Sequence, residues 1–230
     1  TTHTLTFVPV FKNPDHSLSM MLRGQLTSGQ STSQSTVTYG TPSGPIHSTA
    51  ANGIVDGMNT GSGQWRSIYL TYSAHYAYKG RYVADFSLRR DGTTKFGADK
   101  RWGTFPALSV RWNVSREPWF NKALPWVSML SIRPGWGIVG KQPGSEYLYF
   151  SKYAIGKGYL SQGSIYPQNI RMKNLKWEQK ETYNIGADFG FFDDKISGNV
   201  EVYRQYTSDL LMQNRGIPTS SGYPHLLWQN

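Results

Sequence analysis

The stretch Arg81–Trp112 has the pattern of two β-strands joined by a polar, Gly-containing loop, and the alternation of side chains along each strand limits the fold more than any other feature. Its apolar positions are Tyr82, Ala84, Phe86, Leu88, Pro106, Leu108, Val110 and Trp112. Its intervening positions, mostly charged or hydroxylic, are Arg81, Val83, Asp85, Ser87, Arg89, Ala107, Ser109 and Arg111. Because successive side chains of a β-strand point to opposite faces, we expect two strands that each separate an apolar environment from a hydrophilic one.

Strand patterns of this kind recur about eight times along the chain, and helical patterns are nearly absent. The expected strands are 3–11, 18–28, 64–78, 81–90, 102–115, 128–139, 181–191 and 196–212. The connections are tight at 12–17, 79–81 and 193–195, middling at 91–101 and very long at 30–63 and 140–177, with a short helical turn expected in 116–127. Antiparallel neighbours joined in this way place short turns at one end and long, exposed loops at the other, which is typical of an outer-membrane β-barrel.

Composition is compatible with a membrane barrel, although no segment approaches the roughly 20 apolar residues of a membrane helix. Aromatic residues make up 14% of the chain, with 15 Tyr and 8 Trp, as interfacial aromatic girdles would require. A soluble carbohydrate-binding β-sandwich would also be aromatic, and it stays open as the alternative. Its apolar positions, however, would be mainly Val, Ile and Leu, and its loops would not sort by length.

The net charge of +10 also raises the hypothesis of a basic nucleic-acid-binding β-protein. Lys and Arg are scattered singly or in pairs among aromatic residues rather than gathered on one face, which disfavours nucleic acid as a partner. The chain has no cysteine, so it has no disulfide, thiolate metal site or cysteine nucleophile.

No set of residues indicates catalysis, a metal site or a cofactor. Asp91-Gly92 with Lys95 lacks the order of a phosphate-binding loop, and Asp193-Asp194 is a turn. The five histidines are far apart and show no metal-ligand spacing. We therefore expect that the protein is not an enzyme.

Three stretches resemble SusC/RagA-type TonB-dependent outer-membrane transporters. The run LRRDGTTKFGADKRWGTFPALSVRWNVSREPWF, from Leu88 to Phe120, is similar to a hallmark stretch of that family. The segment Leu175–Leu211 resembles a second hallmark, with a Leu-Lys-Trp-Glu entry and a Tyr-Asn-Ile-Gly strand. Ser131–Gly144 resembles the stretch between them, with Trp136 where Tyr is usual and Lys141 where Asn is usual, and Ile217–Tyr223 resembles the loop that follows.

The resemblance implies an all-β fold that is part of a 22-stranded antiparallel transmembrane barrel, with a plug domain that is absent from this chain. Residues 1–230 are then one partial TonB-dependent receptor β-barrel domain, a fragment of a longer transporter. The implied function is TonB-dependent import of an oligosaccharide or peptide across the outer membrane of a Gram-negative bacterium. The implied partners are a SusD-like lipoprotein that acts as a lid, the TonB complex, outer-membrane lipid and, in a dimer, a second transporter–lipoprotein pair.

Three groups of side chains receive roles on this interpretation. The outward aromatics are expected to contact lipid and anchor the girdles: Tyr72, Tyr76, Tyr78, Tyr82, Trp112, Trp136 and Tyr183. The inward charges are expected to form ion-pair networks: Arg81, Arg89, Arg111, Arg133, Asp85 and Asp188. Contacts to substrate or lid are assigned to loop aromatics, above all Tyr147, Tyr149, Tyr153, Tyr223 and Trp228, with Tyr159 and Tyr166 as further candidates.

Overall fold

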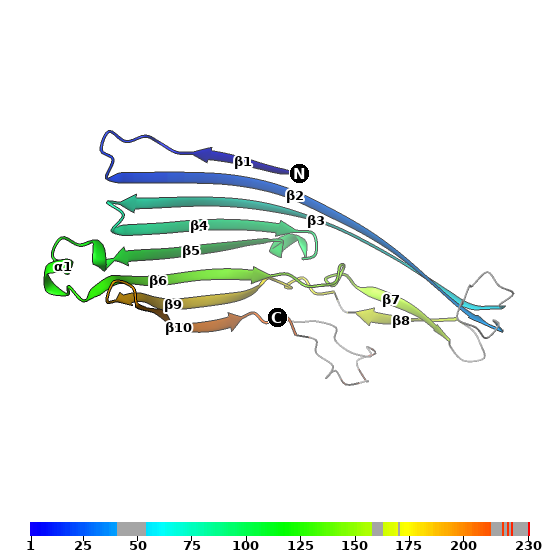
Figure 1. Ribbon diagram of the computed structural model, residues 1–230. Coiled ribbons are helices and arrows are strands. Elements are labelled where there is room, and N and C mark those ends of the chain that lie inside the picture. Colours follow the sequence, from blue (N-terminus) through cyan, green and yellow to red (C-terminus); the bar gives the residue numbers. More distant parts are fainter. Residues whose placement is uncertain are drawn as a thin grey trace.

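One antiparallel eight-stranded sheet with the strand order β1-β2-β3-β4-β5-β6-β9-β10 dominates the computed structural model, and β7 and β8 form a separate hairpin (Figure 1). The structure describes residues 1–40, 54–157, 163–169, 171–212, 218, 220, 222 and 230. The strands are β1 (Thr2–Phe7), β2 (His16–Tyr39), β3 (Ile54–Tyr78), β4 (Tyr82–Thr93), β5 (Trp102–Asn113), β6 (Val127–Lys141), β7 (Lys152–Lys157), β8 (Gly163–Asn169), β9 (Glu178–Phe191) and β10 (Ile196–Ser208). The expected all-β, antiparallel fold is confirmed.

The connections alternate between the two ends of the sheet (Figure 1), and short turns and long loops sort only in part, because the β5–β6 connection at 114–126 is longer than the β4–β5 connection at 94–101. The β1–β2, β3–β4, β5–β6 and β9–β10 connections lie at one end, which we call the turn end; the others lie at the loop end. At the turn end, Lys79 and Gly80 have φ of 52° and 61°, the left-handed conformation that reverses the chain within three residues. The expected helical turn is α1 (Phe120–Ala123), in the β5–β6 connection.

The strand register joins like side chains into two continuous faces. One row of directly paired neighbours from β4 to β9 is Phe86, Leu108, Trp136 and Tyr183. The adjacent row, from β3 to β6, is His75, Asp85, Ser109 and Gly135. We call the first side the apolar face and the second the polar face. A slip of one residue in any strand would exchange its two sets of side chains, so this pattern specifies the register strongly.

The apolar face is exposed in the part of the chain that the structure describes. Leu108, at its centre, is 44% exposed, and the neighbouring Phe86 and Tyr183 are exposed as well. The only other described sheet is the β7–β8 hairpin, and it makes few contacts with the eight strands. The aromatic sides therefore do not fold against one another into the core of a sandwich.

The prediction of a long loop at 30–63 is wrong for most of this stretch. β2 and β3 stay paired from Gln30↔Gln64 to Tyr39↔Ile54, well beyond the other strands (Figure 1). This extension is rich in Ser, Thr and Gly and has no apolar alternation, because both of its faces are exposed to solvent. Backbone pairing holds the two strands together there without a hydrophobic face.

Three other boundaries also differ from the expectation. The stretch 140–177 is not a single loop, because β6 continues to Lys141 and the β7–β8 hairpin lies within it. β1 ends at Phe7 instead of Phe11, just before Pro9, which cannot donate a backbone hydrogen bond to a ladder. β10 ends at Ser208 rather than Met212.

Two small clusters of buried side chains close the ends of the sheet. The loop-end cluster is Phe96, Phe105, Leu148, Leu175 and Trp177. The turn-end cluster is Val114, Phe120 and Val127. Among the described residues, none of the helices has both the length and the apolar character that crossing a membrane demands.

Candidate functional site

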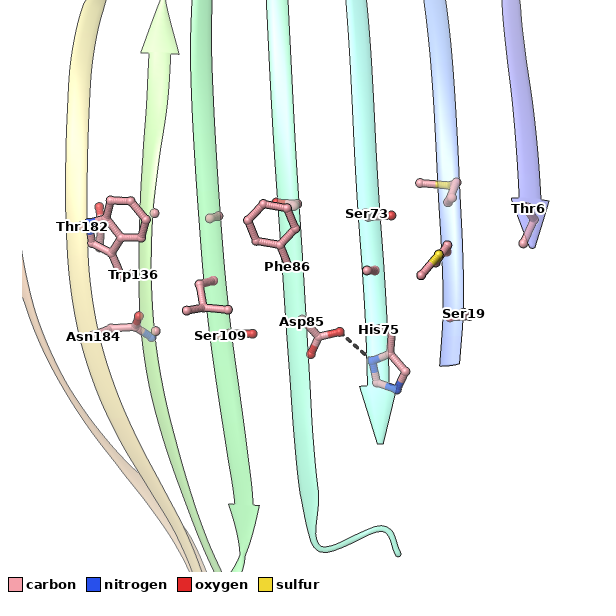
Figure 2. Close-up of a pocket in the computed structure, with 18 residues that line it drawn as sticks. Thr6, Ser19, Ser73, His75, Asp85, Phe86, Ser109, Trp136, Thr182 and Asn184 are labelled. Atoms are coloured by element: carbon pink, nitrogen blue, oxygen red, sulfur yellow. Dashed lines mark hydrogen bonds and ion pairs between the residues drawn. The ribbon is translucent and has the colours of Figure 1, made fainter. Parts of the chain in front are cut away.

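The polar face borders an open hollow of about 590 Å³ near the middle of the sheet (Figure 2). Most residues around it are small or carry a hydroxyl group; among them are Ser73, Ser87, Ala107, Ser109, Gly135, Gly137 and Thr182. His75 of β3 and Asp85 of β4 meet there, with Nδ1 and Oδ1 2.6 Å apart (Figure 2). Such a surface offers hydrogen bonds and room rather than a reactive group.

Asp188 is the centre of a charged network on the same face. Its carboxylate accepts hydrogen bonds from Arg133 at 2.6 Å, Ser131 at 2.8 Å and Arg111 at 3.1 Å. These residues come from β5, β6 and β9, so the network ties three strands together across the face. The ion pairs expected from the sequence at Arg111, Arg133 and Asp188 are therefore present.

The other charges expected in this network have different partners. Arg89 pairs with Asp91 at 2.7 Å, and Arg81 lies 3.5 Å from Glu117. Asp85 contacts His75 instead of an arginine. The His75–Asp85 contact follows the strand register, which pairs these two residues directly, whereas Arg89 and Asp91 are neighbours along β4.

Glu117 is a buried carboxylate at the turn end that the sequence reasoning missed. Its Oε1 accepts hydrogen bonds from the Tyr82 hydroxyl at 2.6 Å and from the Trp112 indole at 3.1 Å. These two hydrogen bonds, with the charge of Arg81, hold the pKa of Glu117 below its ordinary value of 4.5. The carboxylate thus fixes the polar ends of two aromatic rings that stack on each other.

We expect Glu117→Gln in the full-length protein to weaken the turn end at neutral pH and to matter less in acid. Because the folded-state pKa is lowered, the stability that this carboxylate supplies is present above its unfolded pKa and is lost as pH falls through the folded one. Denaturant unfolding of the wild type and of Glu117→Gln at pH 7 and at pH 3 measures how far the substitution lowers the free energy of unfolding at each pH. If the free energy of unfolding differs between wild type and variant by the same amount at both pH values, this role is contradicted.

A second hollow, of about 550 Å³, lies at the loop end beside Tyr147 and Tyr149, two of the aromatics assigned to ligand or lid. The β3–β4 pairing stops at Ser67↔Thr93, and beyond it the Tyr147 hydroxyl accepts a hydrogen bond from the Gln64 backbone at 2.9 Å. Tyr149 packs against the loop-end cluster. The sequence therefore selected two residues that do border a hollow, and both also have structural contacts.

Trp65 and Lys95 belong to this loop-end site and were not singled out from the sequence. Trp65 borders the hollow, and the Lys95 Nζ lies 5.5 Å from the centre of its ring. Lys95 is buried and donates hydrogen bonds to the backbone carbonyls of Pro143 and Gly144. The sequence offered little reason to assign Trp65 to a site. It lies at the start of the expected strand 64–78, just before the clear alternation of 68–78, and not in a predicted loop.

The remaining assigned aromatics are less informative. Tyr153 lies on β7 and is 67% exposed, and Tyr166 lies on β8. Tyr159, Tyr223 and Trp228 lie outside the described residues. Within the described ranges, no group of three His, Asp or Glu side chains could hold a metal ion.

Comparison with known proteins agrees with this geometry. The family model for the β-barrel of TonB-dependent-receptor-like proteins matches residues 3–230. The chain is similar to TonB-dependent receptor SusC of Bacteroides thetaiotaomicron, with 37% identity over 163 residues that cover 68% of this chain and 16% of SusC. It is also similar to TonB-dependent receptor P39 of Formosa agariphila, with 32% identity over 66% of this chain and 14% of that protein.

A solved structure of similar fold is the RagAB peptide importer in its open-open state, with a TM-score of 0.81 and 18% identity, covering 100% of this chain and 25% of that one. The matched part of the chain spans only 16% and 14% of the length of these two curated relatives. The family-model match and the relatedness to SusC show that the chain belongs to the TonB-dependent receptor β-barrel family, as part of a barrel of the SusC/RagA type.

Proposed function

We propose that the full-length protein imports a nutrient across the outer membrane of a Gram-negative bacterium by a TonB-dependent mechanism. Residues 1–230 form one partial barrel domain, which contributes wall and loop-end mouth. The cargo is an oligosaccharide or a peptide, and a SusD-like lipoprotein covers the loop end. The TonB complex acts through segments outside this chain, and two transporter–lipoprotein pairs form a dimer.

The observation that carries this proposal is the two-faced sheet. An apolar face exposed across eight strands needs a non-aqueous surrounding, because a patch of this size is a liability in water. The opposite face is hydrophilic and hollowed, as the lumen of a transport barrel is. A soluble carbohydrate-binding sandwich would instead bury the apolar face against a second sheet.

The β7–β8 hairpin supports a lid partner. Ile155 and Ile165 are directly paired on one side of the hairpin and are 82% and 74% exposed. Tyr153 lies on the same side, paired with Pro167. An apolar surface on a loop-end hairpin suits protein–protein contact, and we assign the lid lipoprotein to it.

The loop-end aromatics remain our candidates for contact with cargo or lid: Tyr147, Tyr149, Tyr153, Tyr223 and Trp228. Support comes from the hollow beside Tyr147 and Tyr149, where an aromatic ring, Trp65, and polar groups of Gln30 and Gln64 lie together. Aromatic faces with nearby hydrogen-bonding groups suit both sugar rings and peptide side chains.

Deletion of the gene in its natural host, followed by complementation, tests the function. Uptake of labelled oligosaccharides and peptides is measured with and without TonB, and we expect one cargo class to be lost in both the gene deletion and the TonB deletion. Wild type and the double variant Ile155→Asp with Ile165→Asp are then compared for the lipoprotein that co-purifies with the transporter. We expect the double variant to lose most of it, since apolar anchors dominate such interfaces.

Ser164→Asp, on the opposite side of the same hairpin, is the matched control and should retain the lipoprotein. Unchanged uptake of every cargo after gene deletion, or recovery of the full-length protein in the soluble fraction, would refute the import function. Normal uptake with unchanged lipoprotein in the double variant would refute only the role of the hairpin.

A further inference from the structure

A groove on the apolar face, just below the loop end, combines a hydrocarbon-like floor with a cationic rim. Two adjoining hollows of about 550 and 560 Å³ share Leu26, Ile68 and Trp102, whose side chains are about half exposed. Arg90 borders one hollow and Arg66 borders the other. The register places Leu26, Ile68, Arg66, Arg90 and Trp102 on the same face as Leu108.

The arginines of this rim have no carboxylate partner within the described parts of the chain. Arg66 and Arg90 are exposed, and Arg90 stacks over the Trp102 ring at 5.3 Å. The nearest acidic neighbour in sequence to Arg90, Asp91, is already paired with Arg89. The rim therefore has guanidinium groups available for an anion.

The position of the rim matches the outer boundary of a membrane. Along β3, Arg66 lies twelve residue steps from Tyr78 at the turn end. At about 3.4 Å per residue and a tilt of about 40°, this is about 31 Å of height, slightly more than an apolar band of about 25 Å. The long-loop side of such barrels is extracellular, so Arg66 lies at the headgroups of the outer leaflet. Arg90 is paired with Leu70, four residues nearer the turn end, and its guanidinium extends over Trp102 toward the loop end.

We infer that this groove binds a lipid of the outer leaflet that carries a phosphorylated headgroup. Its acyl chains lie on Leu26, Ile68 and Trp102, and its phosphate is bound by Arg66 and Arg90. Guanidinium groups suit this role because they bind phosphate through two parallel hydrogen bonds and remain charged at any accessible pH. Part of the chain's excess positive charge, which is scattered in the sequence, is thereby gathered at a lipid site.

The test uses the full-length protein, purified in mild detergent, stripped of lipid and reloaded with lipid A, a phosphorylated and acylated glucosamine disaccharide. Binding of lipid A and of its enzymatically dephosphorylated form is quantified by native mass spectrometry. We expect wild type to prefer the phosphorylated form, and the double variant Arg66→Gln with Arg90→Gln to bind it on the order of tenfold or more weakly, because charge-assisted hydrogen bonds are lost.

Arg23→Gln is the matched control, since Arg23 is an exposed arginine on the opposite face, and it should bind as wild type does. Heat-modifiable migration in gels verifies that all variants are folded. Equal binding of the two lipid A forms by wild type, or an undiminished preference in the double variant, overturns the inference. The inference rests on the outer-membrane placement. Arg66 also borders the loop-end hollow assigned to cargo, so uptake is measured in the single variant Arg90→Gln, where it should be unchanged. If the lipid test fails while this uptake stays normal, the import function still stands.

Discussion

Leu108→Arg in the full-length protein is expected to abolish assembly of a folded barrel, whereas Ser109→Arg one residue later is expected to be tolerated. Leu108 lies at the centre of the apolar face, paired with Phe86 on one side and Trp136 on the other. An arginine at mid-membrane on the lipid side of a barrel costs about 2–4 kcal/mol, a large part of the stability of most proteins. The measurement is heat-modifiable migration of outer-membrane fractions.

Ser109 is the control because it differs only in the face that it occupies. Its side chain borders the hollow of the polar face, where a long side chain has room and Asp85 is the paired neighbour. Equal loss of the folded band in both variants would show that the faces have been assigned wrongly. Normal assembly of both would show that the Leu108 position does not contact hydrocarbon.

Phe96→Ala is expected to destabilise the loop end by about 3–5 kcal/mol, the usual effect of removing a fully buried aromatic ring. Phe96 is 0% exposed, and its ring centre lies 4.9 Å from that of Trp177. The cluster around it joins the β4–β5 connection to segments near Leu148 and Leu175. We expect the variant to keep its barrel but to be cleaved faster in these segments by protease added outside intact cells.

Tyr153→Ala serves as the comparison for this prediction. Tyr153 is also an aromatic of the loop end, but it is mostly exposed, so its removal leaves no cavity. Its protease sensitivity should match that of wild type. Cleavage of Phe96→Ala at the wild-type rate would mean that the cluster does not hold these loop-end segments in place.

The two-faced character of the strands was predictable from sequence because it depends on the alternation of neighbouring residues. Tyr82 to Leu88 and Pro106 to Trp112 show their faces without reference to any other segment. The length of strands was less predictable where this alternation is missing. The extension of β2 and β3 beyond Gln30 and Gln64 is solvated on both sides, so no apolar period marks it.

The candidate sites were only partly predictable, for the same reason. Tyr147 and Tyr149 could be selected because aromatic residues in long loops are often functional. Trp65 could not, because its place beside Tyr147 arises where β3 continues past the end of β4. Glu117 could not be assigned a role either, since its partner Tyr82 is 35 residues away.

Local periodicity alone therefore determined that this chain is an antiparallel β-protein with one apolar and one hydrophilic side, and the resembling stretches identified its family. Only the tertiary structure decided which charges pair and which side chains share a hollow. Asp188 meets Arg111 and Arg133, and Arg66 and Arg90 border adjoining hollows, because strand register brings together residues that lie far apart in the sequence. Contacts between residues so far apart in the sequence produce no periodic pattern from which a single sequence could predict them.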